Sequence, residues 1–222
     1  MRIAFDAKRA HHNGTGLGHY SRTLIQSLAT YFPSNEYLLF NPNPSTTFNL
    51  EGSNVIEIRP SSWIDKVFSS QWRTAGCVSD LKKLDVSLYH GLSHEIPIGL
   101  YKKHIPAVVT MHDIIFERYP SQYKAIDRMI YRKKFKYAIE HADQIIAISQ
   151  QTKDDLIEFY QAPAKKISVC YQSCNPAFQL SVTATEKERI RKKYNLPPAF
   201  FLSVGSIIER KNLLAVCKAY LL

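Results

Sequence analysis

The sequence predicts an α/β protein built on a doubly wound, mainly parallel β-sheet. Short apolar runs rich in β-forming residues recur along the 222 residues of the chain. Longer stretches with helical periodicity separate them, and strands that alternate with helices join one parallel sheet. The rhythm changes near residue 180, which predicts a second unit.

Strands and helices are expected in regular alternation. The strands are expected, in chain order, at residues 2–6, 37–40, 55–58, 86–89, 107–111, 145–148, 167–171 and 200–204. The helices are expected at residues 18–31, in one or two pieces within 62–84, within 123–141 and at 149–160. Ser149 is predicted to be a helix N-cap, because its hydroxyl can accept a hydrogen bond from a backbone amide of the first turn.

Residues 1–180 are expected to form the first domain, and residues 181–222 a linker and the beginning of a second domain. Residues 172–182 are polar and contain proline, which is typical of a connection. A charged helix follows. The apolar run 200–204, a loop and a helix that starts after Asn212 would then form the first βα unit of a second sheet.

The chain is basic, with 29 Lys and Arg residues against 19 Asp and Glu residues and a formal net charge of +10. Such a surface suits phosphate-rich ligands, nucleic acid or anionic lipid headgroups. Nucleic acid is not expected, because the sequence has no recognisable reader motif and its basic residues are spread over several helices. Without a signal-peptide core or a membrane-spanning apolar run, the protein is expected to be cytoplasmic, and its four irregularly spaced cysteines to be reduced.

The segment Asn13-Gly14-Thr15-Gly16-Leu17-Gly18 is the first candidate site. It follows the first strand and opens a helix, so its glycines allow close backbone approach and the helix amides can face an anion. Its spacing matches neither the dinucleotide fingerprint nor the lysine-containing nucleotide loop. We expect contact with a phosphate or diphosphate, and a flexible turn is the alternative.

Polar residues follow two further strands. His112 and Asp113 come after the strand 107–111, at the edge where open α/β sheets bind ligands. His112 can hold a ligand hydroxyl or move a proton, or it can simply cap the turn. His90 is expected to contact substrate, and His94 to be incidental. Although the spacing of these two histidines suggests metal ligands, Gly91 interrupts the helix that such a site needs, so no metal is expected.

Two basic segments complete the candidates. Arg210 and Lys211 precede a helix, a geometry suited to neutralising a diphosphate leaving group, and the alternative is solvated surface. The helix at residues 124–136 is basic on much of its circumference, opposite an expected apolar stripe of Tyr131, Phe135, Ala138 and Ala142. Its basic side is either a solvated face or a contact with anionic membrane.

Taken together and in order, these motifs resemble glycosyltransferase family 4. The matching segments are Gly14-Thr15-Gly16-Leu17-Gly18-His19-Tyr20, Tyr89-His90-Gly91, Thr110-Met111-His112-Asp113, Ile146-Ala147-Ile148-Ser149 and Val204-Gly205 with Glu209-Arg210-Lys211-Asn212. The resemblance covers essentially the whole chain. It implies the B-type glycosyltransferase fold, in which two Rossmann-like domains face each other, the first binding mainly the acceptor and the second mainly the sugar nucleotide.

The resemblance also assigns roles to individual residues. Gly16 and Gly18 would approach the donor phosphates, and Arg210 and Lys211 would hold the diphosphate. His112, with Asp113 beside it, would sit next to the transferred sugar in the catalytic position. His90, Gly91 and Ser149 would line the substrate cleft.

The implied reaction is transfer of a sugar from a nucleotide-diphosphate sugar to a glycan or lipid-linked acceptor, with retention and without a metal or other cofactor. Such an enzyme would serve surface polysaccharide or glycoconjugate synthesis, in the cytoplasm or peripherally at the cytoplasmic face of the membrane. The family's paired donor-binding glutamates are expected beyond Leu222, so the chain by itself is expected to transfer little or no sugar. A sugar-nucleotide epimerase of the same architecture and a non-catalytic truncated binding domain are the alternatives.

Overall fold

The computed structural model describes residues 1–45, 49 and 52–221. The chain forms two compact units, Met1–Asn175 (unit 1) and Pro176–Leu222 (unit 2). The division follows Asn175, and the domain boundary at residue 180 stays a prediction. Unit 1 contains the β-sheet and is described first.

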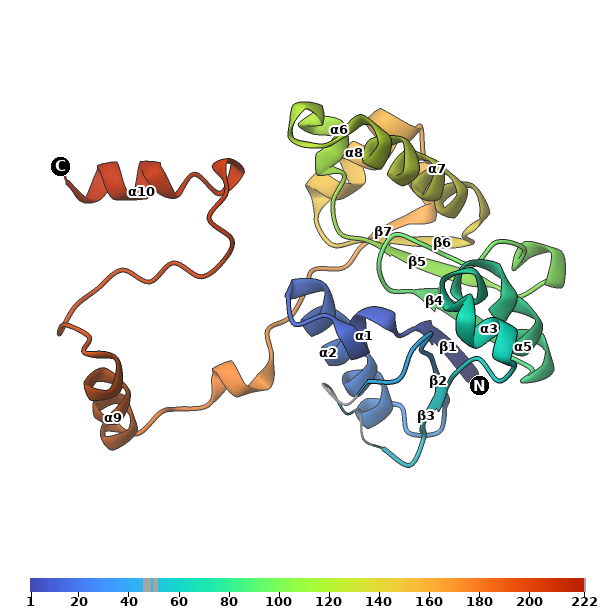
Figure 1. Cartoon of the computed structure of the whole chain (residues 1–222), viewed down its shortest axis with the longest axis horizontal. Helices are drawn as coiled ribbons and strands as arrows, with labels where there is room; N and C mark the ends of the chain where they lie inside the picture. The colour runs from blue at the N-terminus through green and yellow to red at the C-terminus, as the bar shows by residue number, and fades with distance from the viewer. Residues whose placement is uncertain (46–48, 50–51, 222) are drawn as a thin grey trace. The chain divides into compact units, whose positions relative to one another are not determined.

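Unit 1 alternates strands and helices along the chain (Figure 1). The strands are β1 (Arg2–Asp6), β2 (Glu36–Phe40), β3 (Val55–Ile58), β4 (Leu88–Gly91), β5 (Ala107–Met111), β6 (Gln144–Ala147) and β7 (Ile167–Val169). The main helices are α1 (Lys8–His12), α2 (Gly16–Tyr31), α3 (Trp63–Val67), α4 (Ser69–Gln71), α5 (Cys77–Lys83), α6 (Ile115–Arg118), α7 (Ala125–His141) and α8 (Gln150–Tyr160). A π-helical turn, Trp72–Gly76, joins α4 to α5, and short 3₁₀ turns lie at Tyr101–Lys103, Pro120–Gln122 and Ala164–Lys166.

All seven strands form one parallel sheet in the order β3-β2-β1-β4-β5-β6-β7. The predicted α/β fold with a doubly wound parallel sheet is therefore confirmed. Because β1 lies in the middle, between β2 and β4, the strand order reverses there, and this reversal is the topological switch point of the sheet.

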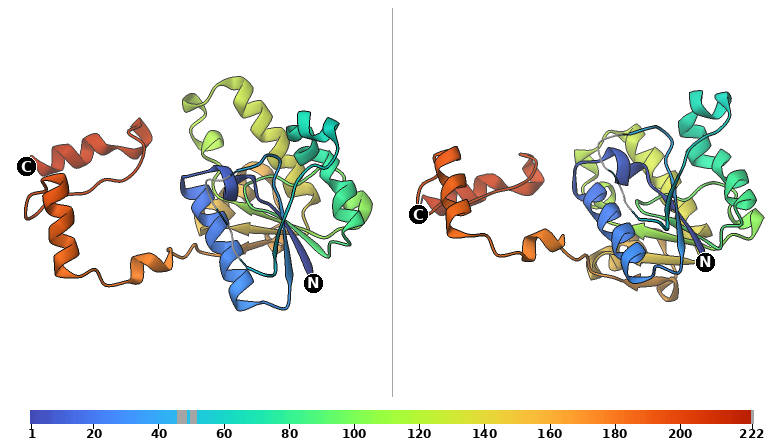
Figure 2. Two further views of the ribbon diagram at one scale, coloured as in Figure 1. Left: turned by 60° about the horizontal axis from the view of Figure 1, so that its bottom comes forward. Right: turned by 90° about the horizontal axis from the view of Figure 1, so that it is seen from below.

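Two hydrophobic cores cover the two faces of the sheet. Neighbouring residues of a strand point to opposite faces, and accordingly Ala4 belongs to one core and Phe5 to the other. The Phe5 core is closed by α2, through Ile25 and Ala29. The larger core, which contains Ala4, is closed by α5, α7 and α8 on the opposite face (Figure 2).

Strand β4 begins at Leu88, two residues later than the segment 86–89 predicted from the sequence. The amide of Val86 donates to the Leu81 carbonyl, so Val86 completes the end of α5 instead of pairing in the sheet. Strand β7 is likewise shorter than the predicted 167–171. Helix α1 has no counterpart in the prediction, since it is too short to show a period, whereas the π-helical turn lies within the range 62–84 in which helices are expected.

Unit 2 contains α9 (Ala184–Tyr194), α10 (Leu213–Tyr220) and the 3₁₀ turns Pro176–Gln179 and Glu209–Lys211. The predicted strand 200–204 is wrong for this structure: Phe201, Leu202 and Val204 are exposed and unpaired. A β-strand needs a neighbour to accept its backbone hydrogen bonds. The described residues of unit 2, 176–221, contain no other strand that could supply them.

Candidate functional site

The carboxyl ends of β4 and β5 bring together several of the predicted residues. His90 lies at the end of β4, beside the switch point, and His112 directly follows β5. In open parallel sheets this edge forms the crevice that receives ligands. The side chains of His90, His94, Thr110 and His112, together with Tyr20 from α2, are called the histidine cluster below.

His112 is buried and fixed at both ring nitrogens. Its Nε2 lies 2.9 Å from the Leu92 carbonyl oxygen, which can only accept, so Nε2 carries the proton. The neutral ring then accepts at Nδ1, where the Gln172 side-chain amide donates over 3.1 Å. Nδ1 is therefore the nitrogen through which His112 could meet a ligand hydroxyl, once Gln172 moves aside.

His94 holds the backbone of His112. Its Nε2 accepts a hydrogen bond from the His112 amide at 2.9 Å, and its own amide donates to the Thr110 carbonyl. The two imidazole rings meet edge to face with their centroids 5.3 Å apart. No local pattern predicts this contact, because a sequence position alone does not show that the loop folds back onto β5, and whether His94 is incidental to ligand binding is not tested by it.

Tyr20 joins α2 to the two strand ends. Its hydroxyl lies 3.0 Å from the hydroxyl of Thr110, which in turn lies 2.8 Å from His90 Nε2. The Tyr20 ring stands edge-on to the His112 ring at a centroid distance of 4.7 Å. Tyr20 is a residue that site prediction missed, although it closes the glycine-containing motif at the start of α2.

Ser149 is connected to His112 through Thr152. As predicted, Ser149 caps α8: its Oγ accepts the Thr152 amide at 3.1 Å. The Thr152 hydroxyl then donates to the His112 carbonyl at 3.1 Å. Ser149 is thus close to the histidine cluster, but these contacts support the cap and do not by themselves test a substrate role.

Asp113 is exposed, next to the buried His112. Its Oδ1 lies 3.4 Å from the Ile115 amide, at the start of α6, and its charge raises the pKa of His112 against the stronger effect of burial. A catalytic role for Asp113 stays a prediction.

The three glycines assigned to the site have different steric surroundings. A Cβ at Gly18 would overlap the Asn13 carbonyl oxygen, and one at Gly91 would overlap the Glu95 carbonyl oxygen. A Cβ at Gly16 meets nothing within 4 Å. Packing thus accounts for Gly18 and Gly91, whereas Gly16 faces open space at the first position of α2, where a ligand could approach.

Substitution of Gly18 and substitution of Gly16 are expected to change the free energy of unfolding by different amounts. Gly18→Ala should lower the free energy of unfolding by about 1–3 kcal/mol, since the added methyl group has no room. Gly16→Ala should change it by less than about 1 kcal/mol. Urea denaturation of the two variants measures the difference, and equal losses would contradict this account of Gly18.

The histidine cluster is neutral near physiological pH. Burial lowers the pKa of His90 to about 4 and that of His94 to about 3, with a smaller lowering by the His112 charge in each case. Burial also lowers the pKa of His112, against the opposing effect of the Leu92 carbonyl. The cluster can therefore accept hydrogen bonds at its unprotonated nitrogens.

These pKa values predict that acid destabilises the protein before its carboxylates titrate. Below about pH 6.5 the unfolded chain protonates His90 and His94 while the folded chain does not. The free energy of unfolding should then fall by about 1.4 kcal/mol per pH unit for each histidine, down to about pH 4. Urea unfolding at a series of pH values tests this, with the His90→Gln/His94→Gln double variant as control. An equally steep slope in that variant would refute the assignment.

Arg210 and Lys211 lie in unit 2, in the 3₁₀ turn Glu209–Lys211 just before α10. Both are exposed. They are on a separate unit from the histidine cluster, so the structure does not test whether they act with it.

Helix α7 shows part of the buried apolar stripe that is expected for it. Phe135, Ala138 and Ala142 are buried, whereas Tyr131 is exposed. Several of its cations are paired: Arg132 with Glu117 at 2.6 Å and Lys134 with Glu95 at 3.1 Å. Among the residues that the structure describes, no helix is both long and apolar enough to cross a membrane.

The described part of the chain also contains no cluster of three or more His, Cys, Asp or Glu side chains arranged to hold a metal ion. That the reaction needs no metal ion stays a prediction.

Comparison with known proteins shows what the chain is similar to. The model of Glycosyltransferase Family 4 matches residues 16–178. The chain is 25% identical to O-antigen chain mannosyltransferase B of Escherichia coli, over 99% of this chain and 60% of that protein. It is 28% identical to O-antigen chain mannosyltransferase RfbU of Salmonella typhimurium over 47% of this chain and 26% of that protein.

Solved structures share the fold at low sequence identity. HepE of Anabaena in complex with UDP-glucose superposes with a TM-score of 0.57 at 15% identity, covering 88% of this chain and 50% of that one. A glycosyltransferase of Rickettsia africae gives a TM-score of 0.54 at 14% identity, again covering 88% and 50%. The chain thus spans about half the length of these structures and 60% of the first curated relative.

Proposed function

This chain belongs to glycosyltransferase family 4, and on that premise we propose that the protein of which it is part transfers a sugar from a nucleotide-diphosphate sugar to a glycan or lipid-linked acceptor. The observation that carries the proposal is the histidine cluster at the carboxyl edge of the sheet, beside the start of α2. It offers an oriented, neutral His112 that packs on Tyr20 of α2, the helix that begins at the open Gly16. Relatives named as mannosyltransferases of O-antigen chains favour mannose as the sugar and surface polysaccharide as the product.

His112 would bind the transferred sugar through Nδ1. The Leu92 carbonyl holds the proton on Nε2, so Nδ1 accepts a hydroxyl that takes the place of the Gln172 amide. The buried ring stays neutral, which avoids an added positive charge beside the oxocarbenium-like transition state. His90, Gly91 and Ser149 would line the acceptor side of the cleft.

The donor diphosphate would be held by Arg210 and Lys211 together with the backbone at Gly16 and Gly18. Two fixed cations can stabilise the negative charge that develops on the leaving group, so the proposed reaction uses no metal. Retention of configuration is proposed from the family resemblance. Contact of the basic helix α7 with anionic membrane is proposed only as a means of reaching a lipid-linked acceptor.

The test is a panel of nucleotide sugars, mannose donors included, with the full-length protein. A bound donor should raise the thermal stability, by about 2.7 kcal/mol at a hundredfold excess over its dissociation constant. Release of nucleoside diphosphate that requires an acceptor would support transfer. Conversion of the donor into an isomeric nucleotide sugar without acceptor would support an epimerase instead, and the absence of both reactions would favour a non-catalytic binding role.

The 222-residue chain alone is expected to transfer little or no sugar under the same conditions. The reason is that the donor-binding glutamates implied by the resemblance have no counterpart within it. Transfer at a rate comparable to that of the full-length protein would contradict this prediction.

A further inference from the structure

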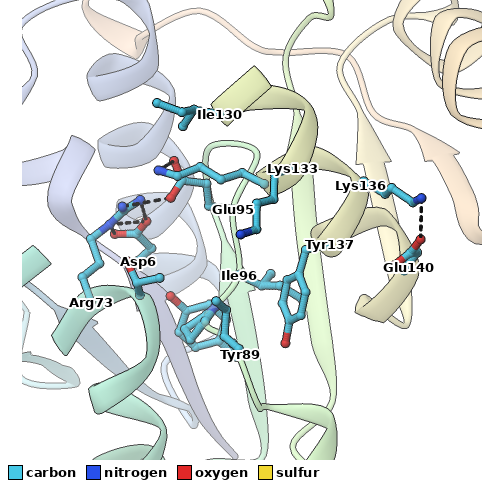
Figure 3. A pocket seen from close by; sticks show the side chains of 14 residues that line it. Asp6, Arg73, Tyr89, Glu95, Ile96, Ile130, Lys133, Lys136, Tyr137 and Glu140 are labelled. Atoms are coloured by element: carbon cyan, nitrogen blue, oxygen red, sulfur yellow. Dashed lines mark hydrogen bonds and ion pairs between the residues drawn. The ribbon is translucent and has the colours of Figure 1, made fainter. Parts of the chain in front are cut away.

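A cavity of about 500 Å³ lies in unit 1, lined by residues of the segment after β4 and of helix α7 (Figure 3). Tyr89 lines it and belongs to the core under α5 and α7. The next residue, His90, points to the other face of the sheet, where it packs on Phe5 with ring centroids 5.7 Å apart. The cavity therefore lies on the opposite face of the sheet from His90, whereas His94 of the cluster packs on Phe135 of the same core as Tyr89, with ring centroids 4.7 Å apart.

The floor of the cavity is an ion-pair network that is satisfied within the protein. The Nε–H group of Arg73 is shared between the two carboxylate oxygens of Asp6, at 3.0 Å from Oδ1 and 3.0 Å from Oδ2. Arg73 also donates to Glu95 at 3.0 Å, and Glu95 pairs with Lys134 at 3.1 Å. The carboxylates therefore leave no unbalanced negative charge to repel an anion.

One cation at the cavity has no partner. Lys136 pairs with Glu140 at 3.8 Å. Lys133 makes no hydrogen bond or ion pair with any residue in the described ranges 1–45, 49 and 52–221. Lys133 is exposed, and Figure 3 shows its side chain extending from α7 at the cavity, between Glu95 and Tyr137.

The hydroxyl of Tyr89 is the second unused polar group. The residue is only 2% exposed, and a buried tyrosine hydroxyl normally has a hydrogen-bond partner. Across the described part of the chain Tyr89 has none, and Figure 3 shows its oxygen on the side of Asp6 and Arg73. Lys133 and Tyr89 thus offer a charge and a hydrogen bond from the two walls of one cavity.

Most of the remaining lining is carbon. Ile96, Pro97 and Ile98 come from the segment after β4, and Ile130 and Tyr137 from α7. Apolar walls with a few convergent polar groups are typical of ligand sites of this volume. The apolar walls suit a hydrocarbon chain, and Lys133 suits an anion at one end of it.

We propose that this cavity binds an anionic amphiphile, a phosphate monoester of an alkyl or isoprenoid chain, with its phosphate on Lys133 and Tyr89 and its chain against Ile98 and Ile130. The proposed ligand carries a phosphate on a hydrocarbon chain, and this hydrocarbon chain distinguishes it from free phosphate.

Isothermal titration calorimetry of the 222-residue chain with decyl phosphate, below its micelle-forming concentration, tests the proposal. One molecule should bind per chain, and inorganic phosphate and decanol should each bind at least about tenfold more weakly. Lys133→Gln and Ile130→Ser should each weaken decyl phosphate binding about tenfold, and Tyr89→Phe should weaken it several-fold.

Two variants outside the cavity serve as matched controls, Lys124→Gln at the N-cap of α7 for the charge and Met129→Ser within α7 for the apolar contact. Both should bind like the unmodified chain. The proposal is overturned if decyl phosphate does not bind, if inorganic phosphate or decanol binds as tightly, or if the control variants lose as much affinity as their counterparts. Circular dichroism of each variant separates lost binding from lost folding.

Discussion

His112→Ala in the full-length protein is expected to lower kcat/KM for sugar transfer by roughly two orders of magnitude or more, because removal of a positioned proton-transfer or charge-stabilising group has effects of that size. The imidazole is already oriented by the Leu92 carbonyl, with Nδ1 available once Gln172 moves. The measurement is the initial rate of nucleoside diphosphate release at several donor concentrations.

The variant also loses a buried hydrogen bond to Leu92, which should cost about 1–3 kcal/mol of stability without unfolding the protein. Urea denaturation therefore accompanies the assay. Gln172→Ala is the matched control: it removes the other partner of the ring and should change the rate far less. A folded His112→Ala enzyme with a normal rate would remove His112 from the proposed chemistry.

Arg73→Leu is expected to cause the largest loss of stability, about 3–5 kcal/mol at neutral pH, because it leaves the Asp6 carboxylate buried and unpaired. That loss is a large part of the 5–15 kcal/mol typical of a whole domain. Burial raises the pKa of Asp6, but the charge and hydrogen bonds of Arg73 outweigh it and hold the pKa below its usual value. The stabilisation is thus present at neutral pH and disappears as pH falls through the pKa of the folded state.

Urea denaturation at neutral pH measures this loss, with two comparisons. Arg59→Leu breaks an exposed pair with Glu57 at 3.8 Å and should cost less than about 1 kcal/mol. The double variant Asp6→Asn/Arg73→Leu should recover part of the stability, since no buried charge remains. If Arg73→Leu is no worse than Arg59→Leu, the network does not stabilise unit 1 as described.

Periodicity and composition were enough to predict the parallel sheet, because strands of a doubly wound fold are continuous apolar runs that need no knowledge of their neighbours. They were less reliable at element ends. Val86 looks like a strand residue, yet its amide completes α5. The run 200–204 has the composition of a strand but lacks a paired strand in the described unit 2, and pairing, not composition, makes a strand.

The candidate site was predicted unevenly for the same reason. His90 and His112 could be found because they lie at strand ends, and the carboxyl ends of parallel strands meet at one edge. His94, Tyr20, Thr110 and Gln172 act through contacts between segments distant in the sequence, and no local pattern marks such contacts. The Asp6 and Arg73 pair joins residues that are 67 positions apart.

The sequence by itself determined the fold class, the family and which residues end the central strands, since these depend on local pattern and order. Only the tertiary structure decided which nitrogen of His112 accepts a hydrogen bond and that Gly18 is required by packing while Gly16 is not. It also placed Tyr89 at the Lys133 cavity and the adjacent His90 on the opposite face of the sheet. These features depend on distances between side chains from different elements, which the packing of the two cores fixes.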